Sequence, residues 1–261
     1  FSRSGLGSGA GAALWAAVAE TIAVKPSQTL PKRIADPSLV ELPLPKPANF
    51  TVAPAQAATP PRKTASGAAS PPRLEGARFV ISVHDPDKLP PDGLPEVAFI
   101  GRSNAGKSSA INTLAGRRRL AFVSKTPGRT QLINIFEVGG AGFVVDLPGY
   151  GYAGVPVAVR EHWDTLVGRY LQERRALGGV ILVMDSRHPL TPLDQRLLDW
   201  LRPAAREVHV LLTKSDKLTY QQSQRTLSQV RKDLQAVYPG ATAQLFSSLK
   251  RTGLDEAHAR I

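Results

Sequence analysis

The sequence contains no cysteine and a single methionine, and aromatic residues make up only 6% of its 261 residues. Without cysteine, disulfide bridges and cysteine-ligated zinc sites are excluded, as is typical of a cytoplasmic protein. No stretch is long and apolar enough to cross a bilayer. Residues 6–24 are mildly apolar, but they are rich in Gly and Ala and include Glu20. Because the chain begins at Phe1 rather than Met, a processed form or fragment is expected, and a targeting peptide stays open as an alternative for this segment.

Negative charge is in short supply, since 21 Asp and Glu face 33 Lys and Arg, giving a formal net charge of +12. This balance favours a polyanionic partner, with nucleic acid preferred over an acidic membrane surface. Taken alone, each cluster of basic residues is more simply interpreted as a solvent-exposed surface without a partner. With so few aromatic residues we expect contacts to a phosphate backbone, weakened by salt, rather than base stacking. The clusters comprise Arg117, Arg118, Arg119, Arg129, Arg169, Arg174, Arg175, Arg231, Lys232, Lys250 and Arg251.

Two regions of unlike character divide the chain. Residues 1–77 are rich in Pro, Ala, Ser and Gly and lack apolar periodicity, so we expect a disordered tail. Such a tail is either simply solvated or helps to hold an RNA. From Arg78 to Ile261, short apolar runs alternate with segments of helical period. This second region is predicted to be the folded domain.

Strand–helix alternation in residues 78–261 predicts an α/β fold with a mostly parallel sheet covered by helices on both faces. Helical spacing of apolar residues occurs over residues 163–171, 193–201 and 227–237. Two of these helices begin with predicted capping boxes, one from Thr191 to Asp194 and one from Thr219 to Gln222. The predicted strands are residues 79–83, 97–101, 132–138, 142–146, 180–185, 209–213 and 243–247.

Residues 101–108 match the phosphate-binding pattern G-x-x-x-x-G-K-[ST]. They follow an apolar strand and precede a helical pattern, which is the context that a P-loop requires. Glycine lets the backbone curl so that successive N–H groups point at phosphates. Lys107 is expected to reach the β- and γ-phosphates, and Ser108 to ligate Mg²⁺. The predicted contacts of this loop are Gly101, Arg102, Ser103, Asn104, Ala105, Gly106, Lys107, Ser108 and Ser109.

A second strand ends in Asp146 and is followed by Leu147, Pro148 and Gly149. At the carboxyl end of its strand, Asp146 can hold Mg²⁺ through water, and the Gly149 N–H can meet the γ-phosphate. Between this strand and the P-loop lies a polar, turn-forming stretch, residues 124–131, that suits a mobile switch loop. We choose its Thr130 as the further Mg²⁺ ligand, with Thr126 as the alternative. Neighbouring residues in the switch, Gly128 and Arg129, are also predicted nucleotide contacts.

A third strand leads into Thr213, Lys214, Ser215 and Asp216, which have the spacing of the guanine-reading N/T-K-x-D box. The Asp216 carboxylate can accept from guanine N1–H and N2–H₂, a pair that adenine lacks, which disfavours a generic P-loop ATPase or kinase. Lys214 would lie along the base or ribose. After the last strand come Phe246, Ser247 and Ser248, where the Ser248 N–H could donate to guanine O6. The ligand is therefore predicted to be GTP or GDP.

These motifs together resemble the EngB family (also called YihA or YsxC) of bacterial ribosome-biogenesis GTPases. The resemblance covers residues 79–255, and its most specific part is the run Asp-Leu-Pro-Gly-Tyr-Gly-Tyr-Ala at residues 146–153. It implies a P-loop NTPase fold of the Ras-like G domain type that binds GTP and GDP with Mg²⁺, and we expect the protein to be a monomer. It also implies a role in assembly of the large ribosomal subunit through rRNA, and a link to septum formation in cell division. Further motif stretches are residues 101–109, 125–131, 184–190, 213–217 and 246–250.

The same resemblance leaves two parts of the chain unmatched. The proline-rich tail is not part of the family core. The C-terminal helix, which begins near Leu254, should continue beyond Ile261, so we expect it to be cut short.

Hydrolysis is predicted to be slow. Many G proteins place a glutamine after the Asp-x-x-Gly turn to orient the attacking water, and here that position is Tyr150. The catalytic residues that remain are Lys107, Thr130, Gly149 and Asn104, the last because an Asn at this place in some related GTPases helps to bind K⁺. Two alternatives stay open: a nucleotide-gated RNA- or ribosome-binding module in which hydrolysis is incidental, and a relative of tRNA-modifying GTPases.

Overall fold

The structure, a computed structural model, describes residues 74–121, 132–151 and 157–261. All of them belong to one compact unit, Leu44–Ile261. The predicted tail therefore lies outside the described residues except at its end. There, Leu74 and Ala77 are buried in the same apolar cluster as Ile111, so packing of the folded domain begins at or before Leu74. No helix in these three ranges is both long and apolar enough to cross a membrane.

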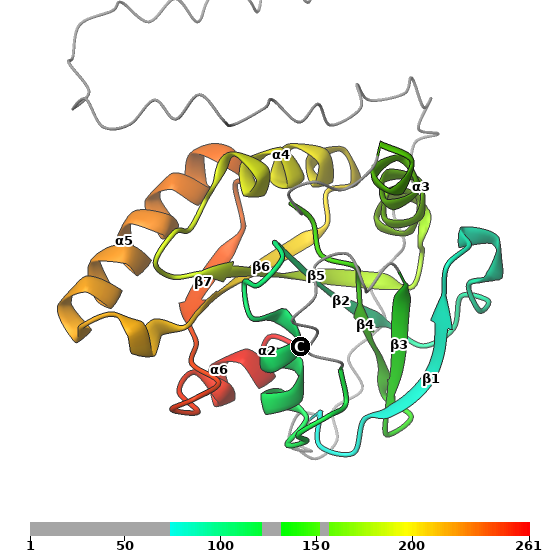
Figure 1. The fold of residues 1–261 in the computed structure, drawn as a ribbon, viewed down its shortest axis with the longest axis horizontal. Coiled ribbons are helices and arrows are strands. Elements are labelled where there is room, and N and C mark those ends of the chain that lie inside the picture. The colour runs from blue at the N-terminus through cyan, green and yellow to red at the C-terminus, as the bar shows by residue number, and fades with distance from the viewer. Residues whose placement is uncertain (1–73, 122–131, 152–156) are drawn as a thin grey trace, which may run out of the picture. The chain divides into compact units, whose positions relative to one another are not determined.

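The centre of the domain is a seven-stranded sheet in the order β1-β3-β4-β2-β5-β6-β7 (Figure 1). β3 is antiparallel to both of its neighbours, and the four pairs from β4 to β7 are parallel. The predicted mostly parallel α/β fold is thus confirmed. The strands are β1 (Arg78–Val83), β2 (Glu96–Gly101), β3 (Ile133–Val138), β4 (Gly142–Asp146), β5 (Leu177–Asp185), β6 (Glu207–Thr213) and β7 (Thr242–Leu245).

Helices cover both faces of this sheet (Figure 1). One face carries α3 (Val157–Glu173), α4 (Pro192–Leu201) and α5 (Tyr220–Val237), and the other carries α2 (Lys107–Leu114) and α6 (Leu254–His258). Short 3₁₀ turns lie at η1 (Pro86–Lys88), η2 (Arg202–Ala204) and η3 (Ser215–Lys217). Two buried apolar clusters form the core, one on each side of the sheet, because the central strands are apolar on both faces.

The predicted helix starts are confirmed in detail. Thr191 accepts a hydrogen bond from the Asp194 N–H while the Asp194 carboxylate accepts from the Thr191 N–H, and Thr219 and Gln222 form the same reciprocal pair. All seven predicted strands are present. The last is shorter than expected, because the chain leaves β7 after Leu245 and turns back in a bridge between Ser247 and Thr252.

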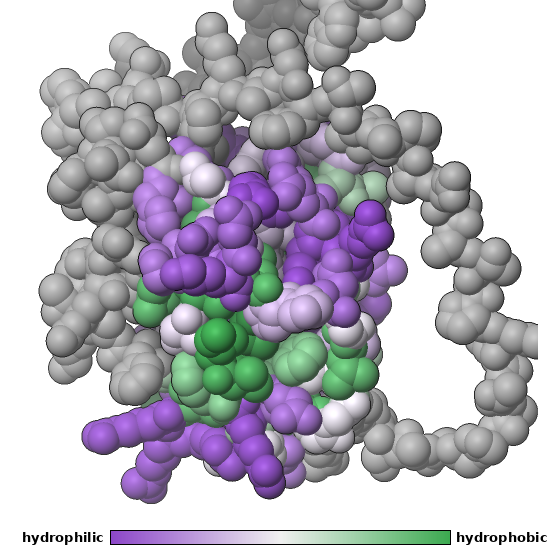
Figure 2. Space-filling model, turned by 90° about the vertical axis from the view of Figure 1, so that its right-hand side faces the viewer, coloured by the Kyte–Doolittle hydropathy of each residue, from purple (hydrophilic) through white to green (hydrophobic). Residues whose placement is uncertain are grey.

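The edge of the sheet at β1 exposes apolar side chains. Phe79, Val80 and Ile81 are 57%, 48% and 38% exposed, and the register of β1 against β3 shifts between Phe79 and Ile81. The side of the molecule that carries β1 shows an apolar patch bordered by hydrophilic side chains (Figure 2). A register shift at an edge strand is one way in which proteins disturb pairing with further strands.

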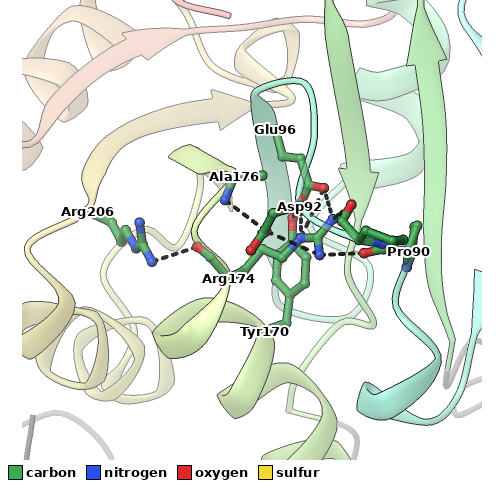
Figure 3. A network of polar contacts seen from close by, with 8 residues as sticks. Pro90, Asp92, Glu96, Tyr170, Arg174, Ala176 and Arg206 are labelled. Carbon is green, nitrogen blue, oxygen red and sulfur yellow. Dashed lines mark hydrogen bonds and ion pairs between the residues drawn. The ribbon is translucent and has the colours of Figure 1, made fainter. Parts of the chain in front are cut away.

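At the amino ends of the parallel strands a buried charge network joins β2 to the end of α3 (Figure 3). Glu96 is 1% exposed and Arg174 8% exposed, and Arg174 donates to both Glu96 carboxylate oxygens, with contacts of 2.5 to 3.1 Å. The Tyr170 hydroxyl also donates to Glu96, at 2.7 Å, and Arg206 donates to the Arg174 carbonyl at 2.8 Å. This network fixes the end of the sheet opposite to the loops described next.

Candidate functional site

The predicted site residues lie at the carboxyl ends of neighbouring strands. Gly101 ends β2, Asp146 ends β4, Asp185 ends β5 and Thr213 ends β6. These four strands are adjacent and parallel in the sheet, so their carboxyl ends meet at one edge. Open α/β sheets place their ligands in the crevice at this edge.

The loop between β2 and α2 has the curled backbone expected of a phosphate cradle. Asn104 and Gly106 have positive φ values, 62° and 102°. Gly106 is the N-cap of α2 and offers no side-chain hydrogen bond to the first turn. A side chain at Gly106 would also approach the Thr213 hydroxyl, at 3.4 Å. The first turn of α2 thus has no side-chain cap, which leaves its N–H groups suited to an anion.

The residues predicted to bind phosphate and metal meet at Lys107 and Asp146. The Lys107 ammonium forms an ion pair with an Asp146 carboxylate oxygen, and the two side chains are 11% and 2% exposed. Ser108, the residue after Lys107 in α2, carries a hydroxyl oxygen, and Asp146 carries a carboxylate. Hard oxygen ligands of this kind are those that Mg²⁺ takes, together with nucleotide phosphates. The residues present therefore fit Mg²⁺; the other proposed ligand, Thr130, lies outside the described residues, as do Gly128 and Arg129.

The loop predicted to read the base, residues 213–216, directly contacts the P-loop. The Thr213 hydroxyl contacts the Ala105 carbonyl and lies 3.0 Å from the Met184 carbonyl. The Lys214 ammonium donates to the Asn104 carbonyl at 2.7 Å. Through these contacts, segments more than a hundred positions apart in the sequence lie against each other.

The loop after β7 orients the Asp216 side chain. Its carboxylate accepts from the Ser247 hydroxyl at 2.6 Å, and this bond, opposed by burial, holds the Asp216 pKa below its usual value. The Ser215 N–H donates to the Phe246 carbonyl at 3.2 Å. The structure thus brings residues 213–216 against residues 246–247, as the motif order predicted. The role of the Ser248 N–H toward guanine O6 stays a prediction.

The sequence model of a family described as "50S ribosome-binding GTPase" matches residues 96–214. A probable GTP-binding protein EngB of Methylobacillus flagellatus is 56% identical over 190 residues, which cover 73% of this chain and 92% of that protein. The chain belongs to the EngB family.

Solved structures share the fold of this EngB chain. A crystal structure of a probable GTP-binding protein EngB has a TM-score of 0.51 at 22% identity, covering 63% of this chain and 95% of the other. Era in complex with MgGDPNP and nucleotides 1506–1542 of 16S ribosomal RNA has a TM-score of 0.52 at 20% identity, covering 64% of this chain and 55% of the other. At these identities the likeness establishes the P-loop GTPase fold alone.

In this EngB chain the residue after the Asp-x-x-Gly turn is engaged in the core. Tyr150 is 8% exposed, and its hydroxyl donates to Asp194 at 2.5 Å. Burial, and then the Asp194 charge, raise the Tyr150 pKa well above its usual value, so the phenol stays protonated. Trp163 donates from its indole N–H to the Pro148 carbonyl at 2.9 Å and lies edge-on to Tyr150. The turn after β4 is therefore fastened to both α3 and α4.

Two carboxylates in this region were not predicted from the motifs to take part in the site. From the sequence, Asp194 was predicted only as part of a helix cap, and Asp185 had no predicted role. The signal for Asp185 was present, because β5 ends in a carboxylate in the same way as β4 ends in Asp146.

Removing the Tyr150 hydroxyl is expected to destabilise this turn. In Tyr150→Phe the buried Asp194 loses one charge-assisted donor and keeps only the two from Thr191. We expect the free energy of unfolding to fall by about 1–3 kcal/mol. Urea denaturation measures it, with Tyr220→Phe as the matched control because Tyr220 is 81% exposed. Equal midpoints for both variants would contradict the role of this hydrogen bond.

Proposed function

We propose that this EngB-family GTPase binds GTP and GDP with Mg²⁺ and acts as a slow switch in assembly of the large ribosomal subunit. The observation that carries the proposal is the junction of three loops: Lys107 contacts Asp146, and Lys214 contacts the Asn104 carbonyl. Phosphate-, metal- and base-binding groups thereby converge at one edge of the sheet. The assigned contacts are those given above for residues 101–109, 128–130, 146–149, 213–216 and 246–248.

Within this proposal, each group has a distinct task. Lys107 and the Gly149 N–H would stabilise charge on the γ-phosphate, and Asp216 would accept from the guanine edge. Ser108, Asp146 and Thr130 would hold Mg²⁺, which neutralises phosphate charge when bound. Asn104 would help to bind K⁺ beside the phosphates. Equal rates of GTP hydrolysis in K⁺ and in Na⁺ would contradict this part of the proposal.

Slow hydrolysis is supported by the engagement of Tyr150. A side chain that orients the attacking water must be free to face the γ-phosphate. The Tyr150 hydroxyl instead donates to Asp194, and a phenol kept protonated cannot act as a base there. A ribosomal partner is then proposed to accelerate hydrolysis. The alternative, a nucleotide-gated binding module in which hydrolysis is incidental, is favoured by the same observation.

A ribosomal partner is supported by the description of the matching family, and by the rRNA in the Era complex. The basic clusters add electrostatic support: Arg117, Arg118 and Arg119 are all exposed directly after α2. One residue of the predicted basic surface is wrong: Arg174 is buried and paired with Glu96, so it is not a surface cation. A cytoplasmic location, a monomeric state and a link to septum formation complete the proposal.

Co-sedimentation with purified 50S subunits tests the switch. We expect binding with GTP to exceed binding with GDP or no nucleotide at least tenfold, and to fall steeply from 50 to about 200 mM salt because phosphate contacts release counterions. Replacing Arg117, Arg118 and Arg119 by Gln should weaken binding, whereas Arg225→Gln on the exposed face of α5 should not. Binding that is equal in GTP and GDP would contradict the switch.

Single-turnover GTP hydrolysis with and without subunits separates the two readings. Acceleration by 50S subunits at least tenfold supports a switch that is reset on the ribosome. Nucleotide-dependent binding without acceleration supports the binding module instead. Lys107→Ala, which removes the phosphate-binding ammonium, is the negative control for both measurements.

A further inference from the structure

Asp185, at the end of β5, gathers an unusual number of donors around a buried carboxylate. Its side chain is 8% exposed. One oxygen accepts from the Arg187 backbone N–H at 3.0 Å and from Arg187 Nε at 2.9 Å. The other accepts from an Arg187 terminal nitrogen at 2.6 Å and from the Lys214 ammonium at 2.9 Å. Burial alone would raise the Asp185 pKa, but these hydrogen bonds outweigh it and lower the pKa, so the carboxylate is ionised at neutral pH.

Lys214 is thereby fixed at both ends of its side chain. Its backbone has a left-handed conformation, with φ of 57°, which is uncommon for a residue with a side chain. Its ammonium is held between the Asp185 carboxylate and the Asn104 carbonyl of the P-loop. A free lysine side chain has considerable rotamer entropy, which it loses when a ligand orders it. Here that ordering is already accomplished by the protein.

We propose that Asp185 is a positioning residue of the guanine site: it holds the Lys214 ammonium against the P-loop, so that the aliphatic stem of Lys214 is in place before the base arrives. This inference rests on the proposed guanine-nucleotide binding. Asp185 acts through Lys214 and touches no nucleotide atom. Its effect is therefore the same for GDP and GTP, which differ only at the γ-phosphate.

Arg187 provides the discriminating comparison, because it shares the same carboxylate without reaching the P-loop in any observed contact. Its side chain is 43% exposed, so its pair with Asp185 is partly screened by water. If positioning of Lys214 is what matters, loss of Arg187 leaves the essential pair intact. A general structural role of Asp185 would instead make Arg187→Gln resemble Asp185→Asn.

A double-mutant cycle on the full chain tests the proposal. Equilibrium binding of fluorescent mant-GDP and mant-GTP is measured for wild type, Asp185→Asn, Lys214→Met and the double variant, with thermal unfolding midpoints recorded in parallel. We expect Asp185→Asn to lower the affinity for both nucleotides about tenfold. In the Lys214→Met background the same substitution should lower the affinity less than twofold. Asp185→Glu should recover part of the loss. Asp199→Asn, which alters an exposed carboxylate paired with Arg202, is the matched control and should change neither affinity.

Each remaining outcome separates the inference from the proposed function. If wild type fails to bind either nucleotide, both are overturned. If wild type binds but Asp185→Asn binds equally well, or loses the same factor with and without Lys214, only the inference is overturned. The same holds if Arg187→Gln reproduces the full loss, or if affinity for GDP is kept while affinity for GTP falls.

Discussion

Asp216→Asn is expected to turn a site for guanine into a site for xanthine. In the proposed site the carboxylate would accept from guanine N1–H and N2–H₂, whereas an amide would place its NH₂ against the guanine amino group. We expect GTP affinity to fall by about 100-fold or more, since a charge-assisted pair is lost and a donor is left facing a donor. Xanthine carries a carbonyl where guanine carries the amino group, so XTP affinity should rise by a similar factor. Competition of GTP, XTP and ATP against mant-GDP or mant-XDP measures both changes.

The geometry of Asp216 makes this substitution informative. The Ser247 hydroxyl orients the carboxylate in the structure, and an Asn oxygen can accept the same bond. The fold should therefore be unaffected and the change confined to base selection. Asp233→Asn on α5, where the carboxylate accepts from Gln229 on the surface, is the control and should leave the preference unchanged. GTP affinity within threefold of wild type in Asp216→Asn would show that another group reads the base.

Much of the fold was predictable because its signals are local. Strand-forming runs bounded by turns and helices begun by capping boxes depend on neighbours within four positions, and both capping boxes were found as predicted. The P-loop and the predicted base box were located from their spacing and the strands that precede them, and the structure places both at the carboxyl ends of parallel strands. The early end of β7 was not, because the Ser247–Thr252 bridge that draws the chain away from the sheet has no such pattern.

The contacts that shape the site were out of reach for the same reason. Tyr150 and Asp194 are separated by 44 positions, and the Lys214 ammonium meets the Asn104 carbonyl across 110. Arg174 was read as a surface cation, since its sequence neighbours are polar and its partner Glu96 lies 78 positions earlier. In each case the sequence shows that a polar group is present, and only the packing of the sheet and helices shows which partner it has.

The Glu96 network supplies the second large effect, and it acts on stability rather than on nucleotide binding (Figure 3). Glu96→Ala would leave the buried Arg174 guanidinium without its buried carboxylate partner, keeping only the part-exposed Asp92 carboxylate at 3.3 Å, and would remove the acceptor of the Tyr170 hydroxyl. Breaking a buried pair from one side costs about 3–5 kcal/mol, so we expect the free energy of unfolding to fall by that amount. Urea denaturation measures this change, provided that the dependence of the unfolding free energy on urea concentration is the same in both proteins. Glu173→Ala, in an exposed pair with Arg169, should cost less than about 1 kcal/mol.

The double substitution Glu96→Met with Arg174→Leu distinguishes a contribution of the pair from the cost of an unpaired charge. Since apolar residues of similar volume can replace a buried ion pair with little loss, we expect the double variant to recover much of the stability lost in Glu96→Ala. The recovery will be partial, because Arg174 also donates to the Pro90 carbonyl at 2.7 Å and the Tyr170 hydroxyl still needs an acceptor. Nucleotide affinity should be unchanged in all three variants, because Glu96 begins β2 whereas the P-loop follows its end. A double variant no more stable than Glu96→Ala would mean that the ion pair itself stabilises this end of the sheet. The loss in Glu96→Ala would then not come from the cost of burying Arg174 without Glu96.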